Sequence, residues 1–81
     1  MNVNVRLSVG FAQTTGTTRL MVDLAEGATI ADLLGQLRAS YLAIETKLQA
    51  AVPTVAGRHV SPTQLLSAGQ EVALLLPVAG G

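Results

Sequence analysis

The chain has 81 residues, which is enough for one domain with a modest core and too few for two domains. Hydrophobic residues make up 49% of it, but only Phe11 and Tyr41 are aromatic, so we expect an aliphatic core and no platform for stacking nucleic-acid bases. Five basic and five acidic residues give a formal net charge of zero, and the basic residues are scattered, so we expect no nucleic-acid partner.

Two strands are predicted near the start of the chain. Apolar and polar residues alternate from Val3 to Val9, the pattern of a strand with one buried face. Residues 10–17 are polar and bounded by glycines, which predicts a loop. A second alternation over residues 20–24 predicts a second strand, and the short separation favours an antiparallel hairpin.

The next segment predicts the main helix. Thr29 stands three residues before Asp32, as in a capping box at a helix start. An apolar stripe at helical spacing follows, formed by Ile30, Leu33, Leu34 and Leu37. Gly35 inside a helix costs about 1 kcal/mol relative to alanine, so we expect close packing there. Residues 41–48 predict a second, shorter helical segment.

The last third of the chain predicts two strands. Residues 52–56 have strand character, but Pro53 requires an edge strand or a start at Thr54. Residues 61–64 predict one short helical turn, with a proline at its first position. Residues 71–76 are the most apolar strand and the candidate for the centre of the sheet.

No side-chain arrangement in the sequence predicts catalysis. There is no cysteine, the single histidine His59 lies in an expected turn, and the acidic residues are dispersed, so no metal site is predicted. The G-x-S-x-G and phosphate-loop motifs are missing. No apolar run approaches the roughly 20 residues of a membrane span, and no signal peptide is visible, so we expect no membrane association and a cytoplasmic location.

The final residues, Gly80 and Gly81, follow closely on the apolar last strand. Two glycines make the thinnest backbone possible, which suits a tail that enters a narrow channel of a partner. An activated carboxylate at its end could accept sulfur or an amine. From the dipeptide alone, a frayed chain end is the favoured interpretation.

Three segments together resemble the MoaD/ThiS-type sulfur carriers of the ubiquitin-like family. They are Phe11-Ala12-Gln13, the stretch EGATIADLL at residues 26–34, and the stretch SAGQEVALLLPVAGG at residues 67–81. The first of them and the chain length look most like the small, sulfur-carrying subunit of molybdopterin synthase. Residues 38–41 and the chain end also look like carriers that feed cysteine biosynthesis.

The resemblance implies an α+β fold of the β-grasp (ubiquitin-like) type over residues 1–76, with a mixed sheet of four or five strands packed on one main helix. Residues 77–81 would be a flexible tail. An adenylating enzyme of the MoeB/ThiF type would use ATP to activate Gly81, and a sulfurtransferase would convert it to a thiocarboxylate. The chain itself would bind no cofactor and would be no enzyme alone.

The resemblance also implies partner contacts. Gly80 and Ala79 would thread into the large subunit of molybdopterin synthase, in a heterotetramer. An exposed patch of Phe11 and Leu75, continued by Pro77 and Val78, would dock on the partner. Other functions stay open: a carrier for cysteine or thiamine biosynthesis, a protein modifier conjugated through Gly81, or an adaptor that is never loaded.

Overall fold

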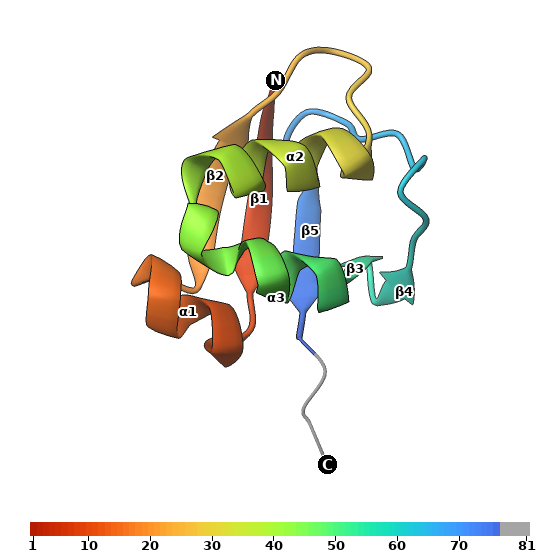
Figure 1. Ribbon diagram of the computed structural model, residues 1–81. Coiled ribbons are helices and arrows are strands. Elements are labelled where there is room, and N and C mark those ends of the chain that lie inside the picture. Colours follow the sequence, from red (N-terminus) through yellow and green to blue (C-terminus); the bar gives the residue numbers. More distant parts are fainter. Residues whose placement is uncertain (77–81) are drawn as a thin grey trace.

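One mixed sheet, with helices on a single face, forms the protein in this computed structural model, which describes residues 1–76 (Figure 1). The strand order is β2-β1-β5-β3-β4. The strands are β1 (Asn2–Leu7), β2 (Arg19–Asp23), β3 (Val52–Val55), β4 (Arg58–His59) and β5 (Glu71–Leu75). The helices are α1 (Val9–Thr15), α2 (Ile30–Ser40) and α3 (Glu45–Ala50), with a 3-10 turn η1 (Leu42–Ile44) before α3.

Strand β5 is the centre of the sheet, as its composition predicts. It pairs in parallel with β1 on one side and antiparallel with β3 on the other. Val72 and Leu74 are 0% exposed and face the helices, so they lie in the middle of the core. The expected β1–β2 hairpin is also present, with Val3 opposite Val22.

The prediction of a loop over residues 10–17 is wrong, because residues 9–15 form α1. Its glycine and threonines are weak helix formers, so the helix depends on burying Phe11, which is 0% exposed. Gly16 ends the helix at φ 78°, and its N–H donates to Ala12 O at 2.8 Å. This is a glycine C-cap.

Helix α2 begins as predicted. Thr29 Oγ1 accepts from the Asp32 N–H at 3.3 Å, and the Asp32 carboxylate accepts from the Thr29 N–H at 2.9 Å, which completes the capping box. The buried stripe includes Leu33 at 0% exposure. The expectation of close packing at Gly35 is wrong, since a Cβ there would meet nothing within 4 Å.

Strand β3 contains Pro53 and is not the sheet edge, because β4 pairs beside it. The Pro53 carbonyl accepts from the Val60 N–H at 3.2 Å, on the β4 side. A residue's nitrogen and carbonyl point to the same side of a strand, so the missing N–H of Pro53 does not interrupt the pairing with β5. Residues 61–64 form a single turn rather than the expected helical turn, with Gln64 N donating to Ser61 O.

The turn between β3 and β4 carries backbone strain. Ala56 has φ 53° and Gly57 has φ 77°, the left-handed pair of a type I′ hairpin. Ala56 is the only non-glycine residue with positive φ among residues 1–76. We expect Ala56→Asn to raise the free energy of unfolding by about 1 kcal/mol, because asparagine tolerates this conformation better than alanine does.

Urea denaturation measures this effect, and Ala68→Asn is the matched control. Ala68 also precedes a turn glycine, but its own φ is not positive, so no gain is expected there. Equal effects of the two substitutions would show that the strain at Ala56 costs nothing.

Candidate functional site

The end of β5 is held by Ser8, which lies between β1 and α1. Ser8 N–H donates to Leu74 O at 3.2 Å, and Ser8 Oγ accepts from the Leu76 N–H at 3.2 Å. Ser8 is the N-cap residue of α1, yet its side chain makes no capping bond to that helix. The hydroxyl therefore fixes the last residue that the structure describes, directly before residues 77–81.

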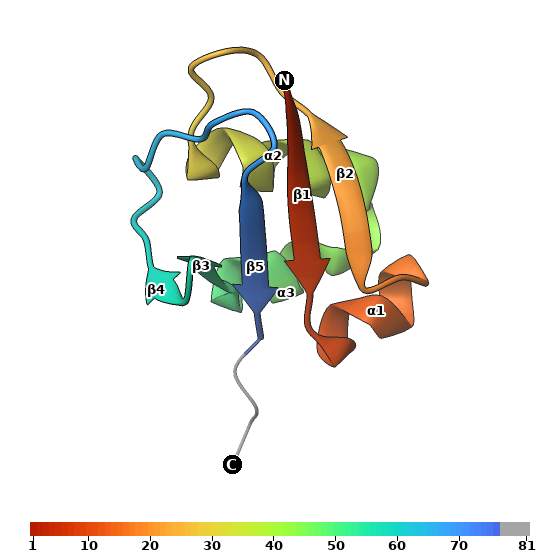
Figure 2. The ribbon, with the colours of Figure 1, turned by 180° about the vertical axis from the view of Figure 1, so that it is seen from behind.

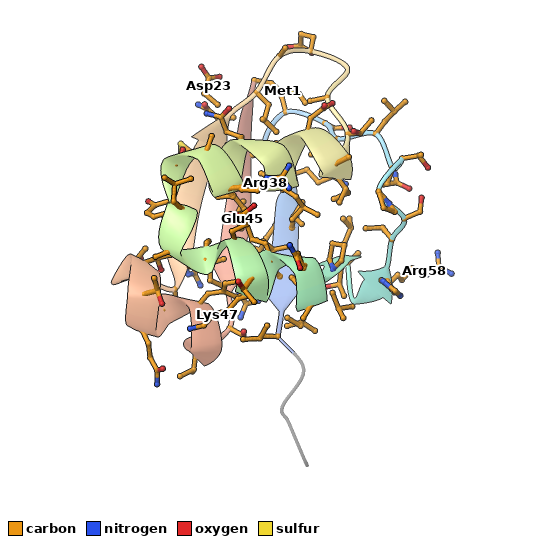
Figure 3. All side chains as sticks on the ribbon, in the orientation of Figure 1. Met1, Asp23, Arg38, Glu45, Lys47 and Arg58 are labelled. Carbon is orange, nitrogen blue, oxygen red and sulfur yellow. The ribbon has the colours of Figure 1, made fainter. Side chains whose placement is uncertain are left out.

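Helices α1 and α3 meet beside this point. A Cβ built on Gly10 would lie 2.6 Å from Leu76 Cδ2, so glycine permits the approach of the chain end to α1 without displacing that side chain. Lys47, labelled on α3 in Figure 3, donates from Nζ to Gly10 O at 2.7 Å and to Thr14 Oγ1 at 3.3 Å. Lys47 thus ties α3 to the helix that supports Leu76.

The sheet face away from the helices is bare at the same end (Figure 2). Leu75 is 48% exposed on it. A hollow of about 200 Å³ lies here, lined in part by Leu75, Ala73 and Arg6. Arg6 Nη1 and Glu71 Oε1 form an exposed ion pair at 3.4 Å. An apolar side chain with a hollow and a charged border is a surface on which another protein can dock.

The expected patch of exposed Phe11 beside Leu75 is only half correct. Leu75 is exposed, but Phe11 is fully buried, because α1 directs it into the aliphatic core. The prediction of an exposed Phe11 is therefore wrong. The other predicted site residues lie outside the described residues: Pro77, Val78, Ala79, Gly80 and Gly81.

The sequence alone does not indicate that Ser8, Gly10 and Lys47 belong to this site. A serine before an apolar segment indicates a helix N-cap, but its bond to Leu76 joins residues 68 positions apart. The contact from Lys47 to Gly10 spans 37 positions. Neither spacing produces a local sequence pattern, so only the fold brings these groups together.

A second hollow lies on the helix-covered side of the sheet. Arg38 on α2, Glu45 on α3 and His59 on β4 line an open hollow of about 450 Å³. Within this part of the chain, no three His, Cys, Asp or Glu residues gather to hold a metal ion. None of the helices there has the length and hydropathy of a membrane span.

The sequence profile of the ThiS family matches residues 7–81, nearly the whole chain. The chain belongs to the ThiS family. Members of this family are small ubiquitin-like sulfur carriers or modifiers that are generally not catalytic by themselves. No curated protein sequence matches the chain.

Solved structures similar to this ThiS-family protein share its fold. SAMP1, small archaeal modifier protein 1 from Haloferax volcanii, is 25% identical, with 100% of both chains covered and a TM-score of 0.89. A putative molybdopterin converting factor subunit 1 from Pyrococcus furiosus is 24% identical, with 96% of this chain and 99% of that one covered and a TM-score of 0.86. The match to the Amycolatopsis orientalis BexX/CysO complex is 21% identical, covers 98% and 99%, and has a TM-score of 0.74.

These matches confirm the β-grasp fold that the resemblance implies for this ThiS-family protein. The mixed sheet has five strands, α2 and α3 lie across its covered face, and α1 lies at the end of the sheet where β1 ends and β2 begins (Figure 1). The BexX/CysO complex shows a relative of this fold assembled with a partner protein.

Proposed function

We propose that this protein is a sulfur carrier that works through the carboxyl group of Gly81. The match of the ThiS family profile, which runs through Gly81, is the observation that carries the proposal. The geometry of the described residues supports it, because Ser8 binds the Leu76 N–H at the rim of the sheet and Gly10 leaves room for the Leu76 side chain. The five residues 77–81 can then reach at most about 18 Å into a partner, at 3.3–3.6 Å per residue.

The proposed chemistry has two steps. An adenylating enzyme of the MoeB/ThiF type joins the Gly81 carboxylate oxygen to the α-phosphorus of ATP and releases pyrophosphate. A hydrosulfide ion delivered by a sulfurtransferase then attacks the carbonyl carbon, the carbon–sulfur bond forms as the bond to AMP breaks, and a thiocarboxylate results. ATP belongs to the partner in this scheme, and the chain holds no cofactor.

The pathway that we propose for the sulfur is molybdopterin biosynthesis. The sequence Phe11-Ala12-Gln13 supports it, and the fold is also that of the Pyrococcus furiosus protein named as a molybdopterin converting factor subunit. The chain would then be the small subunit of molybdopterin synthase, and the large subunit would dock over the exposed Leu75 in a heterotetramer. Carriers for cysteine or thiamine biosynthesis use the same chemistry and are the alternatives.

A second candidate function is protein modification. The similarity to SAMP1, at 25% identity over the full length of both chains, favours it. The same acyl-adenylate would then react with a lysine amine of another protein, and an amide would form as AMP leaves. Both functions require activation at Gly81 and differ only in the nucleophile.

Intact-mass spectrometry of the protein isolated from its own host separates the two. We expect a population heavier by the difference between one sulfur and one oxygen, with the change located in the peptide that ends at Gly81. Branched peptides, with Gly81 joined to lysines of other proteins, would instead support the modifier. A fully unmodified carboxylate under conditions of active synthesis of the cofactor would contradict both.

A further inference from the structure

Strand β2 is an open edge of the sheet. It pairs with β1 on one side, and no strand follows it on the other side among residues 1–76 (Figure 2). Backbone hydrogen bonds mark the two ends of the β1–β2 ladder. Leu7 N–H donates to Thr18 O at 2.8 Å, and Leu24 N–H donates to Met1 O at 2.7 Å. Bonded and non-bonded pairs alternate along an antiparallel ladder.

This alternation decides which backbone groups of β2 face outward. Leu20 and Val22 direct their N–H and C=O groups toward β1, whereas Arg19, Met21 and Asp23 direct theirs away from the sheet. The outward groups of Met21 and Asp23 have no hydrogen-bond partner among the described residues. Such an edge is a template for a further strand.

The side chains along this edge carry complementary charges. Arg19 and Asp23 are both exposed at the two ends of β2, and Met21, at its middle, is 68% exposed. All three side chains lie on the bare face of the sheet. Arg19 stands directly opposite Arg6 of β1, a like-charge pair, and no acidic group among residues 1–76 forms an ion pair with it.

We infer that β2 pairs antiparallel with β2 of a second copy of this chain, about a two-fold axis at Met21. Met21 then faces Met21, and each Arg19 faces the Asp23 of the other copy. The outward groups of the three residues meet as hydrogen-bonded pairs. The interface is isologous, because the same strand serves on both sides.

Only this register pairs the outward backbone groups of the two strands with each other and also places each Arg19 opposite an Asp23. A shift by one residue places the outward N–H and C=O groups of one β2 opposite residues of the other β2 whose N–H and C=O groups already face β1. A shift by two residues places Met21 or Ala25 opposite Arg19 in place of Asp23. On the helix side, a hollow of about 180 Å³ between β2 and α2, lined in part by Leu20 and Tyr41, leaves room beside the edge.

Existing contacts compete with the pairing and keep it weak. Thr17 Oγ1 accepts from Arg19 N at 3.2 Å and donates to Arg19 O at 2.9 Å, so it must move aside. The amino group of Met1 lies 3.3 Å from Asp23 Oδ1, but the Asp23 side chain remains 85% exposed and can accept a second cation. One pair of short strands buries less than a permanent interface does, so the dimer is transient.

The pairing does not rest on the proposed function. The edge β2 is separated from the Ser8–Leu76 site by β1, and the bare face around Leu75 stays open in the dimer. The two β5 strands run antiparallel to each other across the two-fold axis, so the two Leu76 residues lie at opposite ends of the joined sheet.

Charge reversal with rescue tests the inference. In sedimentation equilibrium, the natural chain should show a monomer–dimer equilibrium that weakens with salt. Arg19→Asp and Asp23→Arg should each lower the association constant by about tenfold, because each creates two like-charge pairs across the axis. The double variant should regain the natural value within about threefold. Arg58→Asp, on the opposite edge strand β4, is the matched control and should change nothing.

A cross-link tests the register independently. The chain has no cysteine, so Met21→Cys places a single thiol at the proposed axis. Opposed residues in a hydrogen-bonded pair have Cα atoms about 5.5 Å apart, a separation that a disulfide spans. We expect its disulfide dimer to form at least about tenfold faster than that of Val9→Cys, a 71% exposed position on α1.

Two results would overturn the inference, provided that circular dichroism shows folded variants. One is a natural chain that stays monomeric up to millimolar concentration, together with equal cross-linking rates for the two cysteine variants. The other is a double charge variant that associates no better than the single ones, which would mean that Arg19 and Asp23 do not face each other.

Discussion

One alanine appended after Gly81 is expected to abolish adenylation of the chain while its melting temperature stays unchanged. The extra residue moves the reactive carboxylate by about 3.3–3.6 Å along an extended chain. The rate of a catalysed step depends strongly on the positions of the reacting atoms, and a displacement of 1 Å can lower the rate on the order of 100-fold. Because Ser8 fixes Leu76 at the rim of the sheet, Leu76 cannot move back along a docked domain to take up the added length without losing that hydrogen bond.

The measurement is ATP–pyrophosphate exchange by the cognate adenylating enzyme, with a thermal melt of the same variant as the control for folding. The addition lies beyond β5 and the core, so the melt should not shift. If the extended chain is adenylated as fast as the natural one, Gly81 is not the working end of this protein.

Phe11→Ala is expected to lower the free energy of unfolding by about 3–5 kcal/mol. The side chain is 0% exposed, and its removal leaves a cavity that the surrounding aliphatic residues fill only in part. A small domain has about 5–15 kcal/mol in total, so the variant should be partly unfolded on mild warming. Helix α1 should be lost first, since Phe11 is its only buried residue.

Leu75→Ala is the matched control for Phe11→Ala. Leu75 is 48% exposed, so its truncation should change stability by less than about 0.5 kcal/mol. Urea denaturation of the two variants compares them directly. A Phe11→Ala variant of full stability that binds the partner poorly would instead restore the surface role that the sequence predicts for this residue.

Much of the fold can be predicted from local patterns in the sequence. The capping box of Thr29 and Asp32 needs only residues three positions apart, and the alternation in β1 and β2 needs only neighbours. The apolar run of β5 likewise indicates a strand buried in the middle of the sheet. These features depend on backbone geometry that repeats every two or three to four residues, which makes them readable from one sequence.

The segments predicted wrongly are those whose structure depends on contacts between residues far apart in the sequence. Residues 10–17 contain glycines and threonines and predict a loop, yet burial of Phe11 against the core stabilises α1. Gly35 indicates close packing, yet open space surrounds it. The hydrogen bond between Ser8 and Leu76 joins residues 68 positions apart, so no local pattern could reveal how Leu76 is held.

The central position of β5 constrains when the protein can fold. The hairpin of β1 and β2 and the hairpin of β3 and β4 contact each other in the sheet only through β5. A nascent chain that has not yet exposed residues 71–75 outside the ribosome therefore has two separate hairpins, each marginal alone. Folding is completed after β5 emerges, so this domain is synthesised almost entirely before its sheet can close.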